Sequence, residues 1–354
     1  MIGSSCLGDR PRDRGQSRVP DPPAMMTPYS IPCPPPKWRV FDLVETTDRA
    51  EGVYHTGYDR VMPPTIWILE DQLSPGLEPL RQATDGAPVF MVESDRAWRA
   101  VPFHKRRLVF LAAAMRHFAA ELKAAGRTVA YHPLRPRGYK DSIAALRDHI
   151  QRTGSREFWI VEPSEWHTRE WIDSLRADLG IAIRWFPNTL FLTDRSAFAD
   201  WARPLKSPVM EHFYRRMRKQ HGVLMDGDQP VGGRWNFDVE NRKPLPPNLL
   251  IPPAPRFEPD AITRQVMAEI ERRFPEHPGT ADGFDLPVTR ADARAALRDF
   301  LDHRLPLFGD FEDAMRTDQP VLFHSKLSPA INAGLLSPMQ CIRAAEERYR
   351  RNRA

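Results

Sequence analysis

Four places in the sequence hold residues whose types and spacing could do chemistry, and the first is Asp71. This acid follows the apolar run Thr65–Leu69, which predicts a buried strand. Ligands of open α/β sheets bind beyond the carboxyl ends of the strands, so a carboxylate at this point could contact one. An acidic residue that caps the next helix is an equally good interpretation of Asp71.

Basic and aromatic residues are interleaved in the second place, residues 206–222. These residues are Lys206, Arg215, Arg216, Arg218 and Lys219, with Phe213 and Tyr214. Such a mixture suits the phosphates and unstacked bases of a nucleic acid. The sequence alone favours the alternative of a solvated helix with one apolar side against a core. That side would consist of Met210, Phe213, Tyr214 and Met217.

The third and fourth places lie near the end of the chain. The hydroxyls of Ser325 and Ser328, with free amides at a helix start, could hold a phosphate, although simple helix capping by Ser328 is the better interpretation. Cys341 stands alone on a predicted helix, where a cysteine is usually a small buried hydrophobe. An iron–sulfur cluster needs four thiolates, which the chain does not supply locally. Neither a G-x-G-x-x-G nor a P-loop motif occurs, which disfavours an ordinary nucleotide site.

Length and composition exclude several classes of protein. The chain has 354 residues, a length typical of two domains of about 150 residues each. Its longest apolar run, Leu108–Met115, is far too short to span a membrane. Three scattered cysteines exclude a disulfide scaffold. A formal net charge of +5 is only slight support for binding a polyanion.

Residues 1–61 differ from the rest of the chain. They are rich in proline and show neither helical nor strand periodicity, which predicts a disordered tail. Alternatively, translation starts at Met62 and the tail is not native. The segment has no apolar core of a signal peptide, and we assign no structural role to Cys6 and Cys33.

Alternating strands and helices follow over residues 62–195. The predicted strands are Thr65–Leu69, Pro88–Val92, Thr128–Tyr131, Glu157–Val161 and Ile181–Phe186. Helical spacing of apolar residues predicts helices at His104–Ala125, Asp141–Arg152 and about His167–Leu179. Strands separated by helices predict the α/β class, with a Rossmann-like parallel sheet flanked by helices.

The second half of the chain is predicted to be helical. Residues 196–259 form a polar connector between domains, with one helix near Ser207–Gly222. Residues 260–354 begin an all-α domain, with cap signals at Asp260, Thr289, Ser328 and Ser337. We expect this helical domain to be incomplete, because only about 95 residues are available to it and they finish inside a helix.

Together these segments resemble the deoxyribodipyrimidine photolyase-related proteins, the bacterial iron–sulfur branch of the cryptochrome/photolyase family. The resemblance covers about residues 65–350, and its most specific block is Gly227–Pro244. The other segments that carry it are Ile68–Ser74, Phe103–Leu108, Ala114–Leu122, Val161–Trp166, Lys206–Lys219 and His324–Cys341.

The resemblance implies an α/β domain with a lumazine antenna, a long connector, and a helical domain with FAD and a [4Fe-4S] cluster. It implies light-driven repair of pyrimidine photoproducts in DNA, of the (6-4) type in some members, by electron transfer from reduced FAD. A photosensory protein and a non-catalytic α/β remnant are the alternatives. The expected partner is UV-damaged DNA, with no membrane, and the expected form is a cytoplasmic monomer.

By position, the resemblance assigns Asp71 to the antenna and Cys341 to the first of four cluster ligands. It assigns the flavin-phosphate turn to Ser325, Lys326, Leu327 and Ser328. This sequence has Glu70 where relatives usually have Gly. It has Ala97 close to a position where relatives carry a carboxylate, and its nearest acids are Glu93 and Asp95. Relatives carry the remaining ligands and lesion contacts further along, so we expect this chain to retain none of the three cofactors and to contain no catalytic residue.

Overall fold

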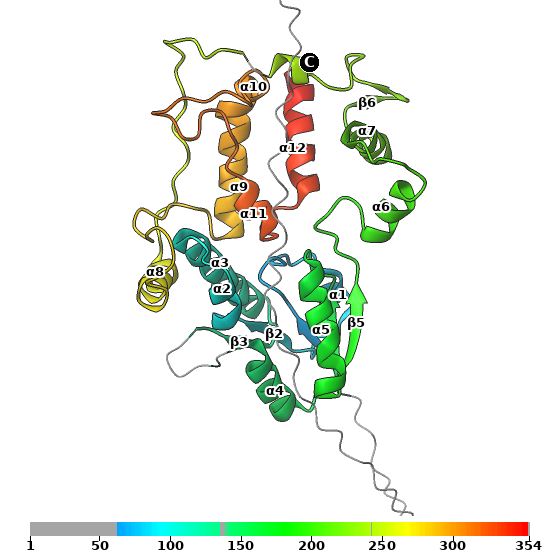
Figure 1. Ribbon diagram of the computed structural model, residues 1–354, viewed down its shortest axis with the longest axis vertical. Coiled ribbons are helices and arrows are strands. Elements are labelled where there is room, and N and C mark those ends of the chain that lie inside the picture. Colours follow the sequence, from blue (N-terminus) through cyan, green and yellow to red (C-terminus); the bar gives the residue numbers. More distant parts are fainter. Residues whose placement is uncertain (1–61, 135–138, 140, 242, 353–354) are drawn as a thin grey trace, which may run out of the picture. The chain divides into compact units, whose positions relative to one another are not determined.

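A five-stranded parallel sheet forms the first half of the computed structural model, which describes residues 62–134, 139, 141–241 and 243–352 (Figure 1). Its strand order is β3-β2-β1-β4-β5, and every neighbouring pair is parallel. The strands are β1 (Thr65–Trp67), β2 (Val89–Val92), β3 (Val129–His132), β4 (Glu157–Val161) and β5 (Ala182–Phe186). This confirms the predicted fold class, while the predictions for residues 1–61, including Cys6 and Cys33, lie outside the described residues.

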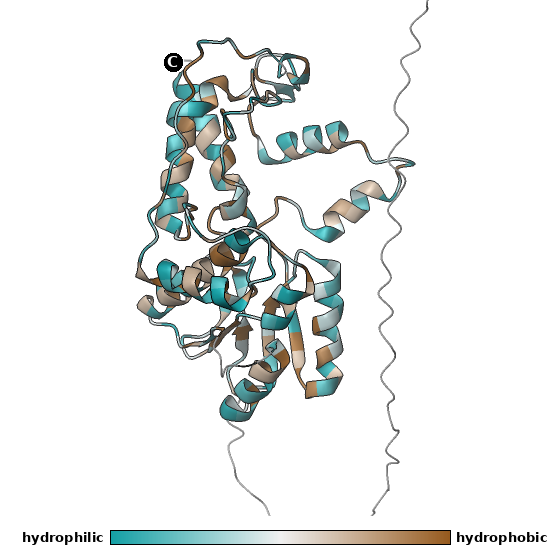
Figure 2. Ribbon diagram, turned by 60° about the vertical axis from the view of Figure 1, so that its left-hand side comes forward, coloured by the Kyte–Doolittle hydropathy of each residue, from teal (hydrophilic) through white to brown (hydrophobic). Residues whose placement is uncertain are grey.

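Helices cover both faces of the sheet, which explains why its central strands are apolar on both sides. Alternate residues of β1 point to opposite faces, so Ile66 packs with one apolar cluster and Trp67 with the other. The first cluster contains the long helix α3 (Lys105–Ala124), and the second contains α4 (Ser142–Thr153) and α5 (Trp166–Leu179). Figure 2 shows hydrophobic residues concentrated on the strands.

Two short helices on the α3 side were not expected from the sequence. They are α1 (Glu78–Gln82) and α2 (Asp95–Ala100), which begin near the ends of β1 and β2. Both have too few turns for a periodic apolar pattern to show in the sequence. α2 is fixed by Trp98, which is fully buried, and its position becomes important for the site described below.

The connector contains α6 (Arg195–Ala202), α7 (Met210–His221), the two-residue strands β6 (Met225–Asp226) and β7 (Gln229–Pro230), and a 3-10 turn at Asp238–Glu240. α7 confirms the helix expected near residues 207–222, whereas α6 and the short hairpin were missed. α6 has no buried residue, and in α7 only Arg218 is buried.

The remaining helices are α8 (Ala261–Arg273), α9 (Arg290–Asp299), α10 (Leu305–Phe308), α11 (Ser328–Asn332) and α12 (Pro338–Arg351). The caps predicted at Asp260, Thr289 and Ser337 are confirmed, since each side chain accepts a hydrogen bond from an amide of the first turn. The cap predicted at Ser328 is wrong, because Leu327 holds that position and Ser328 is already helical. α9 ends earlier than predicted, at a π-helical turn over Phe300–Arg304.

One continuous apolar core joins this helical region to the sheet. α3 packs along α8, and the buried residues Val266 and Ile270 of α8 belong to the same cluster as Met115 and Phe118 of α3. Leu297 of α9 belongs to it as well. The stretch from residue 260 onward is therefore not a closed, self-sufficient core. Among the described residues, no helix is long and apolar enough to cross a membrane.

α12 is attached to the connector through a buried carboxylate. Glu346 accepts hydrogen bonds from the Leu224 amide at 3.0 Å, from Arg343 at 2.6 Å and from Arg350 at 2.8 Å. Arg343 also donates to the His221 carbonyl at 2.6 Å. Burial alone would raise the pKa of Glu346, but hydrogen bonds from Arg350, the Leu224 amide and Arg343 outweigh it and lower this pKa to about 2.

We predict that Glu346→Gln destabilises the protein by about 1–2 kcal/mol at neutral pH, because three donors lose an ionised acceptor. The pKa of Glu346 is lower in the folded chain than in the unfolded one, so this stabilisation is complete above about pH 4.5 and is lost as the pH falls toward 2. Urea unfolding at pH 7 and pH 3 should show the difference between variant and wild type shrinking at pH 3. Glu347→Gln, which removes only an exposed pair with Arg351, is the control; a loss equal to that of Glu346→Gln would contradict the prediction.

Candidate ligand pocket at the carboxyl edge of the sheet

A cavity of about 950 Å³ opens at the carboxyl ends of β1, β2 and β4. The chain runs outward from β1 through β2 to β3, and then returns to build β4 and β5 on the other side of β1. The gap between β1 and β4 is therefore the point at which the strand order reverses. Open α/β sheets bind their ligands at such a point, and the volume suits a ligand of cofactor size.

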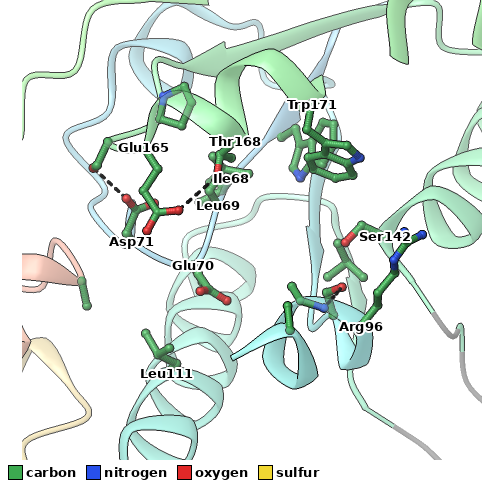
Figure 3. A pocket seen from close by; sticks show the side chains of 18 of the residues that line it. Ile68, Leu69, Glu70, Asp71, Arg96, Leu111, Ser142, Glu165, Thr168 and Trp171 are labelled. Carbon is green, nitrogen blue, oxygen red and sulfur yellow. Dashed lines mark hydrogen bonds between the residues drawn. The ribbon is translucent and has the colours of Figure 1, made fainter. Parts of the chain in front are cut away.

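Helices from both halves of the chain complete the walls of this cavity. α2, α3 and α5 contribute side chains, as do the start of α4 and, from the helical region, α11. Trp171 of α5 stands edge-on to Trp67 with ring centroids 5.9 Å apart and gives one apolar wall. Figure 3 shows Glu70, Asp71 and Glu165 on one side of the cavity, with Trp171, Ser142 and Arg96 on the other.

The loop after β1 carries two of these acids and is held rigidly. The Gln72 side chain is completely buried and donates to the Val161 carbonyl at the end of β4, at 3.0 Å. The Leu73 amide donates to the Ala333 carbonyl at the end of α11, at 2.8 Å. This loop is thus tied to the sheet on one side and to the helical region on the other.

Arg290 and Gly334 close the same junction from the helical side. The Arg290 guanidinium donates to the Leu73 carbonyl at 2.8 Å and to the Leu335 carbonyl at 2.9 Å. Gly334 has a φ of +81°, and a Cβ there would lie 3.0 Å from the Leu73 amide nitrogen. Glycine is required at this position for both its backbone conformation and its close approach to the loop.

Glu70 and Asp71 have unusual surroundings for carboxyl groups. An oxygen of Glu70 accepts a hydrogen bond from the Trp98 indole at 2.7 Å, and an oxygen of Asp71 accepts one from the Ser164 hydroxyl at 2.7 Å. Burial raises the pKa of both groups, and the neighbouring Glu165 adds to the effect. Acids whose pKa is shifted by burial inside a cavity are typical of functional sites.

Comparison with known proteins identifies the family of this chain. Residues 66–286 match the family model described as deoxyribodipyrimidine photo-lyase-related protein, which takes in the sheet, the connector and α8. The chain belongs to this family. A (6-4) photolyase from Agrobacterium fabrum is 40% identical over 296 residues, which is 81% of this chain and 57% of that protein.

Two further matches are more distant. Uncharacterized protein R852 of Acanthamoeba polyphaga mimivirus is 23% identical over 177 residues, covering 47% of this chain and 88% of that protein. The crystal structure of a bacterial class III photolyase from Agrobacterium tumefaciens matches at 18% identity with a TM-score of 0.47, covering 85% of this chain and 59% of that one. This photolyase-related chain thus spans less than two thirds of either photolyase that it matches.

The acids nearest to Ala97 in the sequence of this photolyase-related protein do not line the cavity. Glu93 is buried and accepts from Arg116, from the Tyr131 hydroxyl and from the Leu134 amide. Asp95 pairs with Arg99 and Arg273. Ala97 itself does line the cavity. The acid of the cavity that contacts α2 is Glu70, which accepts a hydrogen bond from Trp98.

The turn 325–328 contributes one residue to the cavity. Ser328 lines it together with Asp71, whereas Ser325, Lys326 and Leu327 do not. Lys326 has a φ of +57°, and the Ser325 hydroxyl accepts a hydrogen bond from the Leu327 amide at 3.3 Å. The structure therefore brings Asp71 and Ser328 to one cavity, although the sequence predicts separate sites for them.

Cys341 is half-buried on α12, where it packs against the apolar core and where burial raises the pKa of its thiol. It is the one cysteine in the part of the chain that the structure describes. Among those residues no three potential metal ligands cluster together. The described residues therefore do not fit a [4Fe-4S] cluster, which needs four thiolates.

The structure separates the basic residues of α7 by role. Arg218 is buried and donates to the Leu224 and Trp235 carbonyls, so it is structural. The interpretation of an apolar side facing a core is wrong for Met210 and Tyr214, whose exposed fractions are 78% and 40%. Phe213 instead packs on two aromatic rings of α6. Arg216 is exposed, and no ion pair to it occurs among the described residues.

We predict that Gly334→Ala lowers the free energy of unfolding by about 2–3 kcal/mol, since a left-handed conformation and a close contact both oppose a Cβ. Gly232→Ala is the matched control: its φ is also +81°, but nothing lies within 4 Å of a Cβ placed there. The control should lose only about 1–2 kcal/mol. Chemical denaturation measures both losses, and equal losses would show that the contact with Leu73 has no cost.

Proposed function

We propose that this chain forms the chromophore-binding part, and one edge of the flavin site, of a light-driven DNA photolyase acting on (6-4) photoproducts. The observation that carries the proposal is the 950 Å³ cavity at the point where strand order reverses, with the partly buried carboxyl groups of Glu70 and Asp71 on one wall and tryptophan on another. The 40% identity to a (6-4) photolyase supports the substrate class. Because the family resemblance is to a bacterial branch, the proposed place of action is the cytoplasm, where bacterial chromosomal DNA lies.

The cavity fits an antenna chromophore, which the family resemblance gives as a lumazine. A planar heterocycle would lie against the apolar side chain of Trp171, with its polar edge toward Glu70 and Asp71. When bound, an antenna supplies absorption of blue light. The residues of this chain orient it and exclude water, and the formed cavity argues against the expectation that the antenna is lost.

The turn 325–328 fits the phosphate end of FAD in its chemistry. It offers the Ser325 and Ser328 hydroxyls and the Lys326 ammonium, which lies 4.0 Å from Asp285. FAD, when bound and reduced, supplies the electron that splits the photoproduct. The contribution of this chain is to hold the phosphate beside the cavity, because Ser328 belongs to both.

The connector offers the side chains that we propose for contact with DNA. Arg216 and Lys206 are exposed and free of ion pairs among the described residues, so both are available to backbone phosphates. The exposed rings of Phe198 on α6 and Tyr214 on α7 are the side chains that we propose to stack with unpaired bases.

A repair assay tests the proposed activity. The chain, fused to the part of the Agrobacterium fabrum (6-4) photolyase that it does not cover, is purified and supplied with FAD and a reductant. It is then mixed with an oligonucleotide carrying one (6-4) photoproduct and is illuminated with blue light. Chromatography should show the photoproduct disappearing in the light and persisting in the dark. Flavin photoreduction without repair would favour the photosensory alternative. Binding of a chromophore with neither reaction would favour the non-catalytic α/β module.

The antenna role has a separate test in Asp71→Ala. Loss of a hydrogen-bonding carboxyl group should weaken the binding of fluorescent pteridines by about tenfold. Fluorescence titration measures the affinity. The control is Asp200→Ala on α6, an exposed acid that pairs with Arg203 away from the cavity. Unchanged affinity in Asp71→Ala would contradict the assignment of this acid to the pocket.

A further inference from the structure

The positive charge of this chain is concentrated on α6 and α7. Residues 195–222, from the start of α6 to the glycine that ends α7, contain seven arginines and lysines and only two acids. Their net charge of +5 equals the formal net charge of the whole chain, so the remainder of the chain is neutral overall. Charge of one sign gathered on two neighbouring helices attracts a polyanion. Which of these side chains reach the polyanion depends on how they are held.

Three of these cations lie near a single aromatic ring, that of Trp235. Arg215, Arg218 and Lys219 follow one another at helical spacing and therefore share one face of α7. Their charged groups lie 5.3, 5.4 and 5.7 Å from the centre of the Trp235 ring. Each distance is within the range of roughly 6 Å over which an aromatic ring attracts a cation. One ring from the loop after β7 thus gathers three charges of the helix.

The turn before Trp235 places its ring on that face. Gly232 and Gly233 have φ of +81° and +74°, a left-handed conformation that residues other than glycine rarely adopt. The Gly233 amide donates to the Pro230 carbonyl at 2.9 Å, which closes the turn after β7. Arg218 of α7 then donates to the Trp235 carbonyl at 3.2 Å. The backbone of Trp235 is thus fixed to the helix whose cations its ring contacts.

The three cations differ in how much of their charge is available. Arg218 is buried and bonded to backbone carbonyls, and Arg215 pairs with Glu211 at 2.7 Å. Lys219 has the weakest partner of the three: its ammonium lies 3.9 Å from Asp228, and the Asp228 side chain is 94% exposed. A pair at that distance in water contributes little, so Lys219 is available to a further anion.

The ring also compensates for the crowding of like charges. Arg215 and Lys219 lie one helical turn apart, where two cations repel each other. Repulsion alone would turn the flexible Lys219 side chain away from Arg215, whereas a shared ring attracts both cations and keeps them together.

We propose that Trp235 is a positioning residue for DNA: its ring holds Lys219 beside Arg215 so that both side chains bind backbone phosphates. Arg216, which is exposed on the same helix, binds alongside them. Such a contact is to the phosphodiester backbone and does not depend on base sequence or on the lesion. The inference rests on the proposed contact between the connector and DNA.

The salt dependence of DNA binding tests this role. The full chain is titrated into a fluorescently labelled, undamaged DNA duplex at salt concentrations from about 50 to about 200 mM, and anisotropy gives the affinity. Trp235→Ala removes no charge, yet it should weaken binding about tenfold at the lowest salt. It should also reduce the slope of log affinity against log salt by about one, the value of one lost phosphate contact. Trp235→Phe keeps a ring beside the cations and should stay within about threefold of the wild type.

A double-mutant cycle separates positioning from a general loosening of the turn. Because the ring acts through Lys219, Trp235→Ala in a Lys219→Gln background should weaken binding by less than about threefold. A purely structural role of Trp235 would instead give the same loss in both backgrounds, and that result would overturn the inference.

Phe237→Ala is the matched control. The Arg234 guanidinium lies 4.5 Å from the centre of the Phe237 ring but is already bonded to Glu240 at 2.6 Å, so loss of this ring should leave the slope unchanged. An unaltered slope in Trp235→Ala, or an equal reduction in Phe237→Ala, would overturn the inference and leave the DNA contact intact. A wild type that does not bind the duplex at low salt would remove the proposed DNA contact and the inference together.

Discussion

The loop between β1 and α1 has buried backbone groups that its own strand cannot satisfy, and the rest of the structure is arranged around that requirement. The Leu73 amide is paired by the end of α11, and its carbonyl by Arg290 at the start of α9. Gln72 reaches across to β4. A buried amide or carbonyl without a partner costs on the order of 1–3 kcal/mol, so the sheet and the helical region must meet at this loop.

Ion pairs at the border of the shared core reinforce the same junction. Arg116 on α3 makes a bidentate pair with Glu93 after β2 and a second pair with Glu269 on α8. Arg273 on α8 pairs with Asp95 on α2 in a similar way. The pair between Arg116 and Glu269 joins α3 to α8, and the pair between Arg273 and Asp95 joins α2 to α8. α8 thus holds α2 and α3 in place, and these two helices line the cavity.

The sequence predicted the larger elements because their signals are local. Apolar strands flanked by turns located all five strands of the sheet, and helical periodicity located α3, α4 and α5. The cap signal at Asp260 located the start of α8. The short helices α1, α2 and α6 were missed because five to eight residues give too little periodicity. A serine before a proline is typical of a helix cap, which favours Ser328, but the chain already turns at Lys326, whose φ is positive.

The site could be predicted only in part, since its decisive contacts join distant parts of the sequence. Asp71 could be placed from its position after a strand. The bond between Glu70 and Trp98 spans 28 residues, and the bond between Arg290 and Leu73 spans 217. No pattern along the chain indicates either one. The meeting of Asp71 and Ser328 at one cavity likewise depends on how α11 docks, which the sequence does not encode locally.

The continuity of the core through α3 has a consequence for dissecting this molecule. α3 is a 20-residue helix with eleven buried residues, and α8 covers it on the side away from the strands. Excising the sheet half at the connector would expose the apolar residues of α3 that α8 covers. It would also leave the Leu73 backbone without Ala333 and Arg290, its hydrogen-bond partners. Such a fragment would self-associate through those apolar residues, because contiguous apolar surface of this extent is rare on soluble monomers. The two halves therefore have to be produced as one piece.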